Sequence, residues 1–169
     1  MMRSAFFLFL ILAGLRISAQ TTSDSSWISP TKDLSAFAKA VNVAGQKSIF
    51  NGQPITIFAP DNQAFGKIST NRLDSLFMPV NNAALIMLLN GHIIQGKLTS
   101  ADIAKAIHDG NGKATFTTLA GTKLVAKINA NRNIVLIGKN RGESIIKTFN
   151  ISQGNIELFT IDSVILPKN

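Results

Sequence analysis

The sequence predicts an α+β domain, in which several short helices of the N-terminal half pack against an antiparallel β-sandwich made by the C-terminal half. Up to Gly110, apolar residues recur at intervals of three and four, which is the period of a helix with one buried face. From Lys113 onward they alternate with polar residues, and Gly and Asn turns separate the runs, as in short antiparallel strands. Helices followed by strands are the order expected of an α+β fold.

The N-terminus has the layout of a secretory signal peptide. Arg3 precedes the apolar run 5–13, which is too short to span a bilayer, and a more polar region leads to Ala19. We assign residues 1–19 to a signal peptide, 20–29 to a flexible lead-in rich in Ser and Thr, and 30–168 to a single domain. This organisation predicts an exported protein of the periplasm, the cell surface or the extracellular space, without a transmembrane segment.

The helical half is read from apolar spacing and from residues that cap helices. The predicted helices are 34–45, capped by Asp33, with a further turn at 46–50; 61–65; 73–77, stopped by Pro79; 83–89, capped by Asn81 or Asn82; and 101–108, capped by Thr99 or Ser100.

The stretch Ile55 to Phe65 organises this half. Its first part alternates β-branched and aromatic residues, so it is read as a strand. Pro60 then removes a backbone donor and Asp61 offers a helix cap, so the strand should turn abruptly into a helix. The corner is expected to seat Phe58 and Phe65 in the core. It is a packing device and not a catalytic motif.

The second half predicts short strands separated by turns. In the run 122–129, alternation places Lys123 and Lys127 on one face and Ile128 on the other, with its apolar neighbours. The expected strands are 115–119, 122–129, 133–138, 144–150, 156–161 and 163–166, preceded by a short strand at 92–94 in the helical half.

Composition excludes several kinds of site. The chain has no cysteine, which rules out disulfides, thiolate zinc sites and a cysteine nucleophile. Without the signal peptide it carries 15 basic and 9 acidic residues, a net charge of +6. Residues 111–169 hold 8 of these basic residues against 3 acidic ones, which favours contact with anionic surfaces.

Three segments in sequence order, 56–65 (TIFAPDNQAF), 88–98 (LLNGHIIQGKL) and 161–167 (IDSVILP), resemble the landmarks of a fasciclin (FAS1) domain. The resemblance covers roughly residues 30–168 in a single copy. It implies a β-sandwich wedge packed against several short helices, in an extracellular protein of adhesive type, and it is similar to the short secreted bacterial members. By analogy with two facing motifs of the family, Asp61 is a candidate partner of His92.

The chain also departs from the family pattern. Adhesive animal members carry a Tyr-His pair after the central helix, whereas here Gly91 precedes His92. An Asp-Ile pair linked to integrin contact would fall near Asn150 and Ile151, where the carboxylate is missing. Phe159 stands where the last strand often has a histidine. An integrin-type site is therefore not carried over to this chain.

Patterns for catalysis, metals and cofactors are weak in this sequence. We expect His92, between Gly91 and an apolar strand, to be structural, with its ring nitrogens bonded to neighbouring groups. A Ser-His-Asp hydrolase would need a nucleophile elbow, which is missing, and the second histidine, His108, lies at a helix end. No cluster of metal ligands and no phosphate-binding loop is evident, so no cofactor is expected. The absence of Tyr and of an aromatic-basic strand pattern argues against nucleic acid.

The basic strands carry the candidate partner-binding residues. These are Lys123, Lys127, Arg132, Lys139, Arg141 and Lys147. They either keep the domain soluble and protect strand edges, or they form a shallow cationic patch for an acidic polysaccharide or a cell envelope.

The leading functional hypothesis is a non-enzymatic module for adhesion to matrix, glycan or an envelope protein. The alternatives are a small-ligand carrier or weak hydrolase with a pocket near His92, and a structural envelope protein that self-associates as a weak homo-oligomer.

Overall fold

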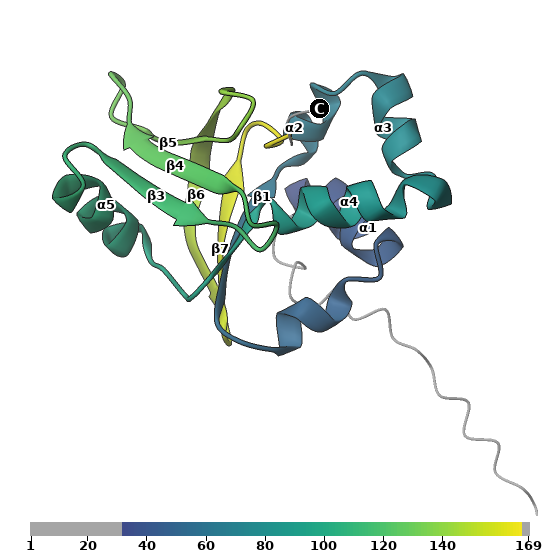
Figure 1. Ribbon diagram of the computed structural model, residues 1–169, viewed down its shortest axis with the longest axis horizontal. Helices are drawn as coiled ribbons and strands as arrows, with labels where there is room; N and C mark the ends of the chain where they lie inside the picture. Colours follow the sequence, from purple (N-terminus) through teal and green to yellow (C-terminus); the bar gives the residue numbers. More distant parts are fainter. Residues whose placement is uncertain (1–31, 167–169) are drawn as a thin grey trace, which may run out of the picture.

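The computed structural model describes residues 32–166 and confirms the α+β class. Most helices lie at one end of the molecule and a curled sheet lies at the other, with α5 (Ser100–Asp109) on the outer side of the sheet (Figure 1). The predicted signal peptide, the lead-in and the start of the domain at residue 30 lie outside the described residues.

The elements follow the predicted order closely. The helical segments are η1 (Lys32–Leu34), α1 (Ser35–Val43), η2 (Lys47–Asn51), α2 (Asn62–Gly66), α3 (Thr70–Leu76), η3 (Pro79–Asn81), α4 (Asn82–Asn90) and α5 (Ser100–Asp109), where η marks a 3-10 helix. The strands are β1 (Ile55–Pro60), β2 (Ile93–Gln95), β3 (Lys113–Thr117), β4 (Lys123–Ile128), β5 (Ile134–Ile137), β6 (Glu143–Gln153) and β7 (Ile156–Ile161).

All seven strands form one sheet in the order β2-β1-β7-β6-β5-β4-β3. Its neighbours are antiparallel, as predicted, except that β1 and β7 run parallel. These two strands come from opposite ends of the domain, so no hairpin turn dictates their direction. A bridge between Ile94 and Thr118 brings the two edges of the sheet together, so the sheet curls into a nearly closed wedge.

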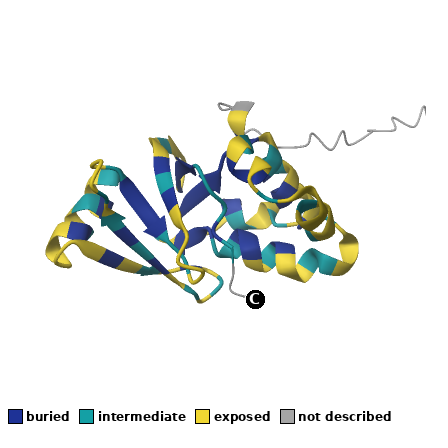
Figure 2. Cartoon of the chain, turned by 90° about the horizontal axis from the view of Figure 1, so that it is seen from above, coloured by how far each residue is buried: buried dark blue, intermediate teal, exposed yellow. Residues whose placement is uncertain are grey.

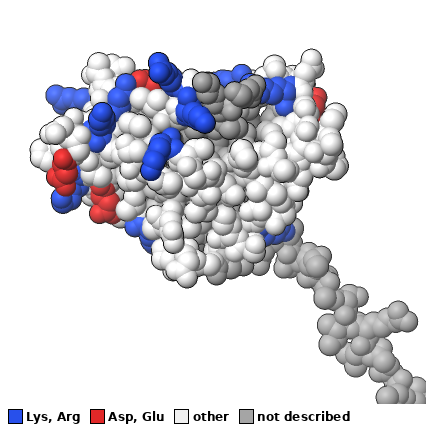
Figure 3. Space-filling view, in the orientation of Figure 1, with Lys and Arg blue, Asp and Glu red and all other residues white. Residues whose placement is uncertain are grey.

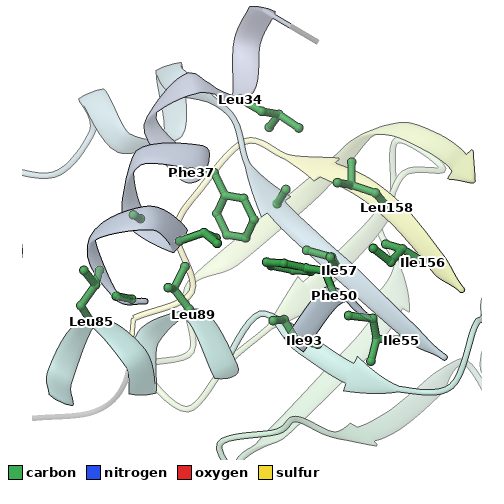
Figure 4. Packing of buried hydrophobic residues seen from close by; sticks show 14 of the residues in the cluster. Leu34, Phe37, Phe50, Ile55, Ile57, Leu85, Leu89, Ile93, Ile156 and Leu158 are labelled. Carbon is green, nitrogen blue, oxygen red and sulfur yellow. The ribbon is translucent and has the colours of Figure 1, made fainter. Parts of the chain in front are cut away.

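Strands β1 and β7 are buried on both faces and separate two hydrophobic cores. Ile57 faces the first core, where Phe37 of α1 and Leu89 of α4 pack against it (Figure 4). Phe58, the next residue, faces the second core inside the curled sheet, where its ring stacks on Phe159 with centroids 5.6 Å apart. Figure 2 shows buried residues concentrated along these central strands and on the inward sides of the helices. Strand alternation thus supplies both cores from one segment.

Two predicted helix caps are wrong. Asp33 does not cap α1, since it lies inside the 3-10 turn that leads directly into the helix. The Asn62 side chain, from α2, instead accepts a hydrogen bond from the Ala36 backbone N–H at 2.9 Å. Asn81 precedes α4 but makes no capping bond. The cap at Thr99 is confirmed as a complete capping box.

The strand predicted at 163–166 is also wrong. This segment follows β7 without joining the sheet, and single hydrogen bonds hold it there. Ser144 donates its hydroxyl to the Ser163 carbonyl at 2.8 Å, and the Ile165 N–H donates to His92 at 2.9 Å. Strand β6 runs on to Gln153, past the predicted end, with register shifts that mark bulges. Ile128, predicted to point inward, is 51% exposed because it ends its strand.

Candidate functional site

The strand-to-helix corner has the predicted local structure. Asp61 follows β1 and caps α2, with Oδ1 accepting the Ala64 N–H at 2.7 Å. Its Oδ2 accepts a hydrogen bond from Lys147 Nζ of β6 at 2.8 Å. The corner residues Phe58, Pro60 and Phe65 are buried, as expected of a packing device. The bond to Asp61, together with its charge, raises the pKa of Lys147.

His92 is fully buried, and both of its ring nitrogens face backbone groups. Nε2 accepts the Ile165 N–H at 2.9 Å, so this nitrogen carries the lone pair. Nδ1 lies 2.8 Å from the Leu88 carbonyl and must therefore be the protonated donor. Burial lowers the pKa of His92 from 6.5 to about 4, although the bond to Leu88 acts in the opposite direction. His92 thus holds helix α4 to the segment after β7 as a neutral ring.

The proposed pairing of Asp61 with His92 is wrong. Each group has other partners: Asp61 bonds Ala64 and Lys147, whereas His92 bonds Leu88 and Ile165. The ion pair with Lys147 joins residues 86 positions apart, so no local sequence signal could have indicated it. A buried carboxylate needs a compensating charge, and this general rule is the one signal that could have suggested a cationic partner for Asp61.

The six predicted binding residues do not form one patch. Lys127 pairs with Glu143 at 2.7 Å, and Lys147 pairs with Asp61. Arg132 lies in the turn between β4 and β5, at the opposite end of β5 from the turn that holds Lys139. The ion pairs therefore offset the charges of Lys127 and Lys147, and Arg132 lies at the other end of β5.

The remaining three, Lys123, Lys139 and Arg141, lie at one end of the sheet, and we call them the cationic cluster. Lys123 begins β4, and the β4–β5 register continued by two residue pairs places it opposite Lys139. Both line the same small hollow, and Arg141 lies in the same turn as Lys139. Among residues 32–166, no carboxylate lies within ion-pair distance of these three side chains. Figure 3 shows basic side chains gathered over the sheet half of one face.

Two hollows adjoin this region. The smaller, beside Lys123 and Lys139, has a volume of about 20 Å³, which is room for a single water. The larger, between α3, α4 and Leu166, has a volume of about 250 Å³. His92 lines neither of them, although Leu88, its hydrogen-bond partner, lines both. His92 is itself fully buried and is exposed to neither hollow.

Residues 32–166 contain no group of three or more His, Cys, Asp or Glu side chains arranged to hold a metal ion. Within the same residues, every helix is too short or too polar to cross a membrane.

The curled seven-stranded sheet, packed against short helices, defines a small α+β domain of the fasciclin type. The fasciclin domain matches residues 32–167, and the chain belongs to this family, which is associated with adhesion. The recognition made from the three sequence landmarks is thereby confirmed.

Several known proteins are similar to the chain. Protein sll1483 of Synechocystis is 31% identical over 114 residues, covering 68% of this chain and 56% of that protein. The immunogenic proteins MPB70 of Mycobacterium bovis and MPT70 of Mycobacterium tuberculosis are each 26% identical over 117 residues, covering 69% of this chain and 52% of theirs. The chain thus spans about half the length of these relatives.

Among solved structures, a FAS1 domain pair from the insect cell adhesion molecule fasciclin I superposes with a TM-score of 0.61. The match has 21% sequence identity and covers 77% of this chain and 45% of the other. It establishes a shared fold.

Proposed function

We propose that this protein is an exported, non-enzymatic interaction module that adheres to an anionic glycan or envelope polymer through the cationic cluster. The single observation that carries the proposal is the meeting of Lys123, Lys139 and Arg141 at one end of the sheet without carboxylate partners among residues 32–166. Unpaired cations on an exposed surface attract a polyanion over roughly one Debye length, about 8 Å at physiological salt.

The non-enzymatic part of the proposal rests on His92. Its ring is closed off from solvent and both nitrogens are occupied by backbone groups, so it is not available as a general base. Export rests on the predicted signal peptide. The family's association with adhesion, and the presence of the same fold in the insect cell adhesion molecule fasciclin I, agree with a binding role.

The test compares two charge-matched variants. Lys123→Glu with Lys139→Glu reverses the cationic cluster, whereas Lys113→Glu with Arg132→Glu makes the same charge change at the other end of β3 and β5. Binding to a sulfated polysaccharide is measured at low and at physiological ionic strength. We expect the first variant to weaken binding at least about tenfold and the second less than about twofold.

Equal loss in the two variants would mean that net charge alone governs binding. Binding by the unmodified protein that is insensitive to salt would also reject a cationic site, because interactions between exposed charges are screened.

A further inference from the structure

The larger hollow lies under helix α3, which has no fully buried residue of its own. Apolar side chains make most of its wall, from Ile68 and Leu76 on one side to Ala84, Leu88 and Leu166 on the other. Its volume of about 250 Å³ exceeds the roughly 150 Å³ that accommodates benzene and falls below the roughly 300 Å³ at which pockets for drug-sized ligands begin. A ligand of intermediate size with an apolar body fits such a space.

The polar groups at the hollow are mainly hydrogen-bond donors. Arg72 and Ser75 are three residues apart on α3, and both line the hollow from the same face of the helix. The Ser75 hydroxyl oxygen accepts a hydrogen bond from Asn81 Nδ2 at 3.0 Å, which leaves its own proton free to donate. No acidic residue lines the hollow in the described part of the chain.

Arg72 has no carboxylate within ion-pair distance among residues 32–166. Its guanidinium presents a planar fork of donors, which matches a carboxylate in a bidentate geometry. The positive charge of Arg72 therefore favours an anionic group at its end of the hollow. The apolar side chains of the opposite wall favour a hydrocarbon group.

We infer that this hollow binds a free monocarboxylate with a short aliphatic body, which places its carboxylate on Arg72 and Ser75 and its chain against Leu76, Ala84 and Leu88. The site differs from the cationic cluster in position and chemistry. It also differs from a pocket at His92, whose ring does not reach the hollow.

The experiment uses octanoate as the probe and amide chemical shifts of the purified protein as the readout. Octanol tests the contribution of the hydrocarbon chain without the carboxylate, and acetate tests the carboxylate without a long hydrocarbon chain. We expect saturable octanoate binding with a Kd below about 1 mM, weaker octanol binding and no saturable acetate binding. Perturbed amides should belong to α3, α4 and the segment around Leu166.

Substitutions at three positions locate the site. Arg72→Gln is expected to weaken octanoate about fivefold and to leave octanol unchanged, because it removes only the charge-assisted contact at an exposed position. Ala84→Phe should abolish the binding of both octanoate and octanol, because its side chain fills the hollow. Ala84→Leu serves the same purpose if the Phe variant does not fold. Arg132→Gln removes a positive charge elsewhere and should bind like the unmodified protein.

Octanoate binding that is unchanged in Arg72→Gln, binding that survives in Ala84→Phe, or no saturable binding below about 10 mM would each overturn the inference. The variant Lys123→Glu with Lys139→Glu should bind octanoate normally. A failure of polysaccharide binding and a failure of octanoate binding can therefore be told apart.

Discussion

Acid should destabilise this domain through His92. The ring is fully buried and neutral, and its pKa falls from 6.5 to about 4 on folding. Between these values the unfolded chain binds a proton that the native protein does not, so stability is lost as pH falls from above 6.5 towards 4. A difference of about 2.5 pH units, at about 1.4 kcal/mol per unit, predicts a loss of about 3 kcal/mol of unfolding free energy.

The physical reason lies in the hydrogen bond between Ile165 and His92. A protonated ring would turn an N–H of Nε2 towards the Ile165 N–H, so an attractive contact would become a repulsive one. The segment after β7 depends on this bond because it forms no strand. We therefore expect the Ile165 amide to lose protection from hydrogen exchange before the strands of the sheet do.

Urea denaturation of the unmodified protein and of His92→Gln between pH 7 and pH 4 measures the effect. Glutamine can offer an oxygen to the Ile165 N–H but does not titrate, so its stability should vary with pH by about 3 kcal/mol less than that of the unmodified protein. His108→Gln, at an exposed helix end, should keep the full acid dependence. The reasoning is refuted if the unmodified protein and His92→Gln lose the same free energy over this range.

Two further substitutions, at Asp61 and at Gly138, are each compared with a control substitution by urea denaturation. Asp61→Ala should lower the unfolding free energy by about 2 kcal/mol, because it removes the cap of α2 and the partner of Lys147. Asp61→Asn, which retains an oxygen for the cap but loses the ion pair, should cost less, and equal costs would contradict a role for the cap. Gly138→Ala would place a Cβ 2.5 Å from Cγ2 of buried Ile165 and should cost about 1 to 3 kcal/mol. Gly142→Ala has no contact shorter than 3.5 Å and should change stability by less than about 0.5 kcal/mol; a similar loss at both glycines would remove the steric explanation.

Features that depend on near neighbours were predicted well. Pro60 and Asp61 end a strand and begin a helix because ring geometry and a cap act within a few residues. The capping box of Thr99 and Asp102 has the same short range. Alternation in β4 correctly placed Lys123 outward and Leu124 inward, since side chains of a strand alternate between faces.

Predictions failed where a group from a distant part of the chain competes with a local one. Asp33 was the obvious cap for α1, yet the Asn62 side chain reaches the first turn across 26 residues. The analogy that paired Asp61 with His92 failed for the same reason. The packing of β6 beside β7 brings Lys147 to Asp61, and the segment after β7 supplies a backbone N–H to His92.

The candidate binding site likewise depends partly on local sequence and partly on contacts between distant segments. Composition identified an excess of basic residues in the C-terminal third, and alternation identified which strand lysines face outward. The β4–β5 register decided that Lys123 and Lys139 meet, and the sheet order brought Glu143 of β6, on the far side of β5, within reach of Lys127. Because a charge acts through its spatial neighbours, its partners follow from register and not from spacing in the sequence.

The sequence by itself determined the α+β class, the family, the order of the elements and the strand-to-helix corner at residues 55–65. These depend on periodicity and on turn and capping chemistry, which act over a few residues. Only the tertiary structure decided the parallel pairing of β1 with β7, the partners of Asp61 and His92, and the hollow beneath α3. Each of these joins segments far apart in the chain, where packing of the whole domain selects among partners that local sequence leaves equivalent.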